Sequence, residues 1–304
     1  MSLCAGEALI DMLPRQTAAG EDTFLPAPGG AVFNTAIALG RLGVETGFFS
    51  GLSTDMFGRQ LVKTLDASNV CTKLAHRSDR PTTLAFVELV HGQASYFFYD
   101  EATAGRMLSA DDLPPDLPGV EALFMGGISL VPDPCGAAYE TLMAWEAETK
   151  VTMLDPNIRP SFITDKEAYR ARIFRMIALS DIVKLSDEDM HWLMGPGDVS
   201  DMARHILKSG PQIFCYTKGA EGVTAYTKNR LYHAPAPQTA VTDTVGAGDT
   251  FNAGFLAGLS RHGALHKDQV GTADLSPALE LGVRAAAVTV SRAGANPPWA
   301  HELD

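Results

Sequence analysis

Short apolar runs alternate with longer amphipathic segments through the second half of the chain. The apolar runs lie at 120–125, 151–154, 182–183 and 213–216, and the segments of helical period lie near 135–149, 165–179, 187–194 and 199–209. Strands and helices that alternate in this way form βαβ units, in which the strands are parallel and the crossovers are right-handed. The pattern therefore predicts an α/β fold with a central, mostly parallel β-sheet flanked by helices.

Two regions interrupt this alternation. Residues 222–226 and 231–234 are separated by a short polar turn and predict a β-hairpin. Residues 82–90 and 95–99 predict two further strands around His91-Gly92-Gln93, with no room for a crossover helix. We expect the region 71–99 to form a small separate sheet together with residues 12–27.

The most informative stretch is 243–254, with the sequence DTVGAGDTFNAG. Val245 can end an extended segment, the small residues 246–248 allow a sharp turn, and apolar residues then recur at helical spacing at Phe251, Phe255 and Leu259. The first N–H groups of a helix have no internal partners, and the helix dipole is positive at that end. This stretch therefore predicts a binding site for a phosphoryl group at a helix start.

Asp249 is unexpected beside such a site, because a carboxylate repels an anionic ligand. Its chemical task would be to take a proton from a hydroxyl group that attacks the bound phosphoryl group. The alternative is that Asp249 only caps the helix.

A second glycine turn, at 28–30, also precedes a helical segment. Asn34 lies one turn into that segment and carries both a donor and an acceptor, which suits a sugar hydroxyl. A Gly-Gly turn with a packed Asn is also common as a purely structural feature.

The composition is that of one enzyme-sized domain covering residues 1–304. The content of hydrophobic residues is 46%, and the net charge is −12 at pH 7. The negative charge argues against partners such as nucleic acid or an anionic membrane. It does not argue against a nucleotide, because ATP is held by local N–H groups, a few cations and Mg²⁺.

The four cysteines are widely spaced and form no CxxC pair, so the usual zinc and redox patterns are absent from the sequence. The start of the chain lacks a basic segment followed by an apolar one, and no apolar run reaches about 20 residues. These features predict a cytoplasmic protein.

Seven blocks in order along the chain carry a family resemblance. They are GEALID at 6–11, GGxxxN at 29–34, GxxxDxxG at 51–58, DPNxRP at 155–160, KLSDED at 184–189, KGAEG at 218–222 and DTVGAGD at 243–249. This series resembles the ribokinase-like (PfkB) sugar kinases, and within them the fructokinases, over residues 6–297. The resemblance implies a ribokinase-like fold in which a small β-sheet forms a lid over the sugar.

The resemblance also implies roles for individual residues. Sugar binding would fall to Asp11, Gly29, Gly30 and Asn34. Catalysis would fall to Asp249 as the base, with Gly246, Ala247, Gly248 and Arg159 stabilising the phosphoryl group. Asp11 is expected at the carboxyl end of the first apolar strand, where an open parallel sheet commonly meets its ligand. From local sequence alone, Asp11 is equally compatible with a turn, and Arg159 with a surface salt bridge.

Binding of ATP is assigned by resemblance to Lys184, Ser186, Thr217, Lys218, Gly219, Gly222 and Gly294. A plain β-turn is the alternative for residues 217–222. Ser186 and Asp189 stand where the family usually has Asn and Glu, so Asp189 would bind Mg²⁺ through more water. The family also implies a monovalent cation such as K⁺, held at Asp243 and the Val245 carbonyl.

The resulting hypothesis is an ATP-dependent kinase that phosphorylates a terminal hydroxyl of a sugar, with fructose as the expected substrate. The alternatives are a 2-keto-3-deoxygluconate kinase, a ribokinase or nucleoside kinase, and a binding protein without catalysis. Asp100 and Glu101 replace the Arg of many relatives, so we expect them to disfavour acidic sugars at the sugar mouth, unless they face solvent and Arg106 supplies the cation. A homodimer through the lid is a further expectation.

Overall fold

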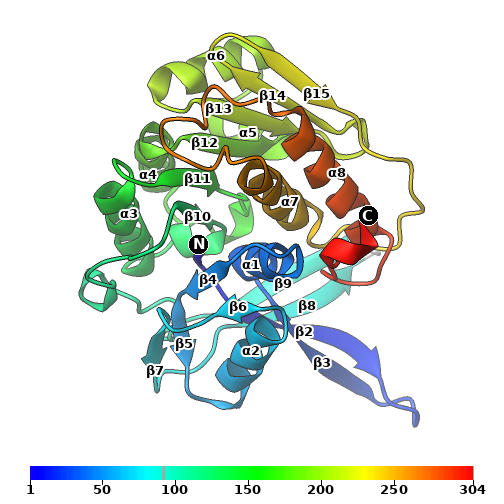
Figure 1. Cartoon of the computed structure of the whole chain (residues 1–304). Coiled ribbons are helices and arrows are strands. Elements are labelled where there is room, and N and C mark those ends of the chain that lie inside the picture. The colour runs from blue at the N-terminus through cyan, green and yellow to red at the C-terminus, as the bar shows by residue number, and fades with distance from the viewer. Residues whose placement is uncertain (91–92, 304) are drawn as a thin grey trace.

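A large β-sheet between two layers of helices forms the body of the molecule, and a small sheet projects from one side (Figure 1). This computed structural model describes residues 1–90 and 93–303. The large sheet has the strand order β15 (Leu231–Ala234), β14 (Val223–Thr227), β13 (Ile213–Thr217), β12 (Ile182–Ser186), β11 (Val151–Asp155), β10 (Ala122–Gly126), β1 (Ser2–Ala5), β4 (Thr46–Phe49) and β6 (Val70–Cys71). Its neighbouring strands pair in parallel from β6 to β13, and β14 and β15 are antiparallel.

Eight α-helices lie within the described residues. They are α1 (Ala31–Arg41), α2 (Met56–Asp66), α3 (Cys135–Glu146), α4 (Lys166–Leu179), α5 (Asp187–Met194), α6 (Val199–Ser209), α7 (Ala247–Arg261) and α8 (Ser276–Val290). Short 3₁₀ turns occupy Ala110–Asp112, Ile128–Leu130, Pro160–Phe162, Gly219–Glu221 and Ala300–Glu302. None of the helices in the described part is both long and apolar enough to cross a membrane.

Successive side chains of each strand point to opposite faces of the large sheet, and this divides the hydrophobic core into two layers. In β1, Cys4 packs with one hydrophobic cluster and Leu3 and Ala5 pack with the other. The first cluster includes buried residues of α1, α7 and α8, and the second includes those of α3, α4, α5 and α6. Both faces of the parallel sheet are therefore covered, as expected for an α/β fold.

The predicted alternation of strands and helices after residue 120 is confirmed. The expected helices near 135–149, 165–179, 187–194 and 199–209 correspond to α3, α4, α5 and α6, and the expected hairpin corresponds to β14 and β15. The strands were predicted one to three residues too short at their carboxyl ends, because polar residues such as Asp155 and Ser186 continue the pairing.

The small sheet has the order β3 (Asp22–Gly29), β2 (Leu9–Gln16), β8 (Leu84–Val90) and β9 (Gln93–Tyr99). Its bounds differ from the expected 12–27 and 71–99. Residues 71–83 do not join it, because β6 pairs with β4 in the large sheet and β7 (His76–Ser78) pairs with β5 (Gly51–Ser53). The expected turn at His91-Gly92 lies outside the described residues.

The position expected for Asp11 is wrong. The apolar run 2–10 forms two strands rather than one, since the chain leaves the large sheet at Gly6 and enters the small sheet at Leu9. A Cβ at Gly6 would lie 2.4 Å from Val32 Cγ2, so the break coincides with close packing against α1. Asp11 is the third residue of β2 and belongs to the small sheet.

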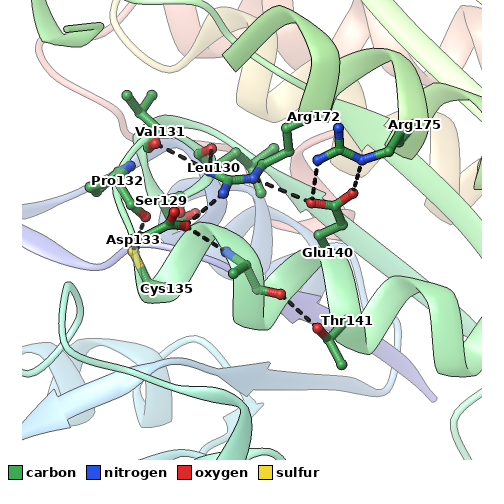
Figure 2. Close-up of polar contacts among 11 residues, drawn as sticks. Ser129, Leu130, Val131, Pro132, Asp133, Cys135, Glu140, Thr141, Arg172 and Arg175 are labelled. Carbon is green, nitrogen blue, oxygen red and sulfur yellow. Dashed lines mark hydrogen bonds and ion pairs between the residues drawn. The ribbon is translucent and has the colours of Figure 1, made fainter. Parts of the chain in front are cut away.

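A network of arginines fixes the turn that follows β10 (Figure 2). Arg172 of α4 donates to the carbonyls of Leu130 and Val131 at 3.0 and 3.2 Å and to Asp133 at 2.6 Å. Glu140 of α3 accepts from both Arg172 and Arg175. The turn begins at Gly127 and Ile128, which line the candidate site, so this network holds one wall of that site.

Candidate active site

The glycine turn before α7 has the predicted geometry of an anion site. Gly246 has a φ of 78°, in the left-handed region that favours glycine, and a Cβ there would lie 2.7 Å from Ala295 Cβ. Within the described residues, the backbone N–H groups of Gly248 and Asp249 have no hydrogen-bond acceptor. These two donors are at the positive end of the helix, so they can hold a phosphoryl group.

Asp249 is buried beside these donors, with 7% of its surface exposed. Asn34 of α1 donates to its Oδ2 at 2.9 Å, and Thr35 Oγ1 donates to its backbone carbonyl at 3.3 Å. Burial raises the pKa of Asp249 to about 7, with a further contribution from Asp155, while the bond from Asn34 acts against the shift. A carboxylate with a pKa near neutrality is suited to accept a proton.

A buried ion pair lies directly behind the anion site. Lys184 Nζ donates to Asp155 Oδ2 at 3.0 Å, and Asn252 Nδ2 donates to the same oxygen at 2.7 Å. Burial alone would lower the pKa of Lys184, but the neighbouring Asp155 and Asp189 raise it, so the ammonium stays charged. A Cβ placed on Gly248 would lie 3.3 Å from Lys184 Nζ, which brings the cation to the turn.

A cavity of about 320 Å³ lies between the small sheet and the body, on one side of the turn. It is lined from β2 by Asp11, from α1 by Asn34 and from the loop after β11 by Arg159. The aromatic residues Tyr96 and Phe98 of β9 also line it, and Gly30 lies at the start of α1. The sequence therefore predicted residues that meet in space, although they come from three separate parts of the chain.

Asp11 and Gly29 are packed against each other inside this region. A Cβ at Gly29 would lie 2.3 Å from Asp11 Oδ2, so a larger residue would displace the carboxylate. Burial raises the pKa of Asp11 to about 6. Gly29 thus leaves room for Asp11 and does not itself line the cavity.

A second cavity, of about 730 Å³, lies on the other side of the same turn. It is lined by the predicted residues Thr217, Gly219 and Gly222 and by apolar side chains of α7 and α8 such as Phe251 and Val283. Thr244, Ala247 and Gly248 line both cavities. The anion site is therefore the point at which a small polar cavity and a larger, mostly apolar one meet.

Several residues assigned to nucleotide or metal binding lie outside both cavities, among them Lys218, Ser186 and Asp189. Lys218 is exposed and forms an ion pair with Glu221 at 2.8 Å. Ser186 and Asp189 form a capping box at the start of α5, and both Asp189 oxygens accept backbone N–H bonds, from Ile158 at 2.8 Å and Ser186 at 3.3 Å. The described residues contain no group of three His, Cys, Asp or Glu side chains that could hold a metal ion.

The residues expected around a monovalent cation do lie together. Asp243 accepts from Val245 N at 3.0 Å and from Gly294 N at 2.9 Å, which ties the loop before α7 to the loop after α8. Gly294 has a φ of 68° and does not line the larger cavity. Its position links it to this loop pair rather than to a nucleotide.

Glu7 has a role that the sequence reasoning missed. Its Oε1 accepts from Ala31 N at 2.9 Å, and its Oε2 accepts from Ser129 N at 3.4 Å. Gly30, with a φ of 111°, passes so close that a Cβ would lie 3.0 Å from the Glu7 carbonyl. Burial raises the pKa of Glu7 despite these bonds. The only sequence signal is an acidic residue within an otherwise apolar run, in the block GEALID at 6–11.

The expectation that Asp100 and Glu101 oppose acidic sugars is wrong. Arg106 Nη1 donates to both oxygens of Asp100 at 3.0 Å, and in this ion pair Asp100 is buried while Arg106 is partly exposed. Neither Asp100 nor Glu101 lines the cavity that contains Asp11, and Glu101 is exposed. The alternative stated for these residues holds only for Glu101, which is exposed. Asp100 is buried, and Arg106 pairs with it and does not line the sugar cavity.

This geometry can support transfer of an anionic group between two bound molecules. The larger cavity can hold a donor whose anionic end reaches the N–H groups of the turn, and the smaller cavity can hold a hydroxyl compound beside Asp249. Positive charge for the transferred group is available from Lys184 and Arg159.

Comparison with known proteins gives consistent matches over most of the chain. A sequence profile described as pfkB family carbohydrate kinase matches residues 1–302. A fructokinase of Rhizobium leguminosarum bv. trifolii is 55% identical over 274 residues, which is 90% of this chain and 84% of that protein.

Two solved structures are also similar. A fructokinase from Xylella fastidiosa with bound ATP has a TM-score of 0.90 at 27% identity, covering 99% of this chain and 96% of that one. A double mutant of the fructokinase from Vibrio cholerae O395, with fructose, ADP and potassium bound, has a TM-score of 0.84 at 25% identity. The match covers 97% of this chain and 93% of that one.

Proposed function

The chain belongs to the pfkB family of carbohydrate kinases, and we propose that it transfers the γ-phosphoryl group of ATP to a terminal hydroxyl of fructose. One observation carries this proposal: two cavities meet at the α7 turn, where Asp249 lies beside unpaired N–H groups. The size of the larger cavity suits a nucleotide, and the 55% identical relative is a fructokinase.

In this mechanism the sugar lies in the smaller cavity. Asp11 and Asn34 accept and donate hydrogen bonds with its hydroxyls, and Gly30 allows close approach of the backbone. Asp249 accepts the proton of the attacking hydroxyl, since its raised pKa makes it a better base than an ordinary carboxylate.

The N–H groups of Gly248 and Asp249 stabilise the charge that spreads over the transferred phosphoryl oxygens. Lys184 adds a positive charge behind the turn, and Arg159, which lines the same cavity, adds a second one. Mg²⁺ bound together with ATP would neutralise part of the charge of the phosphates. Because the Asp189 oxygens are engaged by backbone groups, any contribution of Asp189 to the metal would run through water.

The choice of fructose over acidic sugars rests on the charges that line the smaller cavity. The carboxyl groups of Glu7, Asp11 and Asp249 line it. Of the two cations, Lys184 is already paired with Asp155, which leaves Arg159. A second negative charge on the sugar would therefore meet an unfavourable field.

We expect kcat/KM for fructose to exceed that for 2-keto-3-deoxygluconate or fructose 6-phosphate by at least about tenfold, or about 1.4 kcal/mol. The measurement is ADP release at fixed MgATP with these three sugars and ribose. A preference for an acidic sugar or for ribose would show that fructose is not the main substrate. It would leave the assignment as a sugar kinase in place. Release of no ADP with any sugar would favour the alternative of a binding protein without catalysis.

We also propose that K⁺ binds between the loops that Asp243 ties together, as the potassium-bound structure from Vibrio cholerae suggests. A positive charge there would lie next to the α7 turn and strengthen binding of anions to it. In the same assay, the rate should be higher in KCl than in choline chloride at equal ionic strength. Equal rates in the two salts would contradict the proposal that K⁺ binds at these loops.

The small sheet is proposed to act as a lid on the sugar. Its inward face supplies Asp11, Tyr96 and Phe98 to the cavity, so a bound sugar would contact it directly. Fructose should increase the protection of backbone amides in β2, β3 and β8 from hydrogen exchange, and ATP alone should not. Equal protection by either ligand would contradict a lid specific for sugar.

The outward face of the same sheet is aromatic and supports a homodimer. Phe24, Phe97 and Tyr99 are 45%, 55% and 65% exposed, and Phe86 packs edge-on against Phe24 and Tyr99 with centroid distances of 5.1 and 5.3 Å. Sedimentation should show a dimer for the native chain and a monomer for Phe97→Asp. A native monomer at micromolar concentration would rule out this interface.

A further inference from the structure

A third cavity lies at the opposite end of β13 from the proposed nucleotide site. Gln212, directly before β13, lines this third cavity, whereas Thr217 at the end of β13 lines the nucleotide cavity. The other walls are the end of α6, the turn between β14 and β15, and the loop before α8. The volume is about 890 Å³, within the range of small-molecule sites. The cavity shares no lining residue with the site described above.

The charge of this cavity contrasts with that of the whole chain. The chain has 24 Lys and Arg against 36 Asp and Glu, yet the cavity is lined by four cations and, among the described residues, by no Asp or Glu. These cations are Arg204, Lys208, Lys228 and Arg230. Two of them belong to α6 and two to the turn between β14 and β15, so cations from separate elements add to the field inside one cavity.

Acidic neighbours compensate only part of this charge. Arg204 is paired with Asp201 one turn earlier on α6. Arg230 Nη1 approaches Tyr232 Oη at 3.4 Å, and Asp274 acts on it from a greater distance. Within the described residues, Lys208 and Lys228 have no carboxylate within 4.0 Å and form no side-chain hydrogen bond through Nζ. Two ammonium groups therefore remain available to a ligand.

The floor of the cavity is apolar and well anchored. It includes Leu207 of α6, the buried Pro211 and the half-buried ring of Tyr232. Tyr232 Oη donates to the Ala273 carbonyl at 3.4 Å, which fixes the loop against the hairpin. A ligand would therefore rest a less polar body on this floor and present anionic groups to the cations above it.

We propose that this cavity is a second binding site, for a small phosphorylated metabolite with at least two anionic groups. Guanidinium forks and lysine ammonium groups bind phosphate oxygens by charge-assisted hydrogen bonds. The cations come from two separate elements of the chain, which suits a molecule with more than one anionic group. The volume excludes large polymers, and the net charge of −12 disfavours nucleic acid.

The test is isothermal titration calorimetry on the full chain, with the nucleotide site saturated by a non-hydrolysable ATP analogue and Mg²⁺. The probes are fructose 1,6-bisphosphate, 3-phosphoglycerate and phosphoenolpyruvate. We expect at least one probe to bind saturably, and Lys208→Gln combined with Arg230→Gln to weaken that binding at least about tenfold. All four cations that line the cavity are exposed, so the chain with these two substitutions should fold and keep its kinase activity.

Arg170→Gln is the matched control, because Arg170 is an exposed cation on α4 away from the cavity. It should bind the probe like the native chain. Thr272→Glu adds a carboxylate to the lining and should also weaken binding. The proposal is overturned if no probe binds at millimolar concentration, if the double variant binds as tightly as the native chain, or if Arg170→Gln loses binding equally.

Discussion

Replacing Asp249 with Asn is expected to lower turnover by roughly 10²–10⁴-fold while ATP binding survives. The amide keeps the size of the carboxylate and can still accept the hydrogen bond from Asn34 at 2.9 Å. It cannot accept a proton from the attacking hydroxyl. Turnover measured by ADP release, together with nucleotide affinity measured by calorimetry, tests both parts of this expectation.

The pH dependence of the native enzyme gives an independent test of Asp249 as the base. Because the pKa of Asp249 is raised to about 7, kcat/KM should be highest above that pH and fall as the pH decreases through it. An ordinary aspartate would lose activity only near pH 4. A profile that stays flat from pH 8 to 5, or an Asn variant with near-native turnover, would remove Asp249 from the role of base.

Stability provides the control for the Asn variant. The pKa of Asp249 is higher in the folded state than its ordinary value of 3.8, so the folded state binds the proton more tightly between about pH 4 and 7. The native chain therefore loses stability as the pH rises through this window. Asn does not titrate, so the variant should be at least as stable as the native chain at pH 7.5, and its lost turnover cannot be attributed to unfolding.

The second large effect concerns Lys184, whose replacement by Met should reduce the free energy of unfolding by about 3–5 kcal/mol. The substitution leaves the Asp155 carboxylate buried with only the 2.7 Å bond from Asn252 as a side-chain partner. Burying an unpaired charge is much more costly than losing the pair as a whole. Urea unfolding followed by circular dichroism gives the required free energies.

Asp155→Asn in the same chain is the control. It removes the uncompensated charge, so the double variant should recover most of the stability lost by Lys184→Met. Turnover should stay low in both Lys184→Met and the double variant, because the cation behind the α7 turn is missing from both. A Lys184→Met chain as stable as the native one would show that Asp155 is not held as a charged partner.

The parts that followed from sequence are those set by local chemistry. The Gly-Ala-Gly turn could be predicted because few other sequences allow the left-handed backbone of Gly246 before a helix. The alternation after residue 120 was readable because each strand contains a short apolar run. The meeting of Asp11, Asn34 and Asp249 followed from family resemblance rather than from spacing.

The parts that failed depend on contacts between distant segments. An apolar run from residue 2 to 10 gives no sign that Gly6 divides it between two sheets, since the reason is the approach of Val32. The burial of Asp100 depends on Arg106 turning back to pair with it. Glu7 and Asp189 each bind backbone N–H groups of remote segments, and such partners leave no pattern in the sequence.

The strand order of the large sheet also dictates when the molecule can fold during synthesis. β1 is the first strand made, but it lies between β4 and β10, and β10 begins about 120 residues later in the chain. At roughly 5–20 residues per second, β1 waits on the order of 6–24 s for its second neighbour. During that time its apolar residues and one of its edges are uncovered on the nascent chain. Ribosome-bound chains that end before residue 122 should therefore be the ones that chaperones bind most strongly.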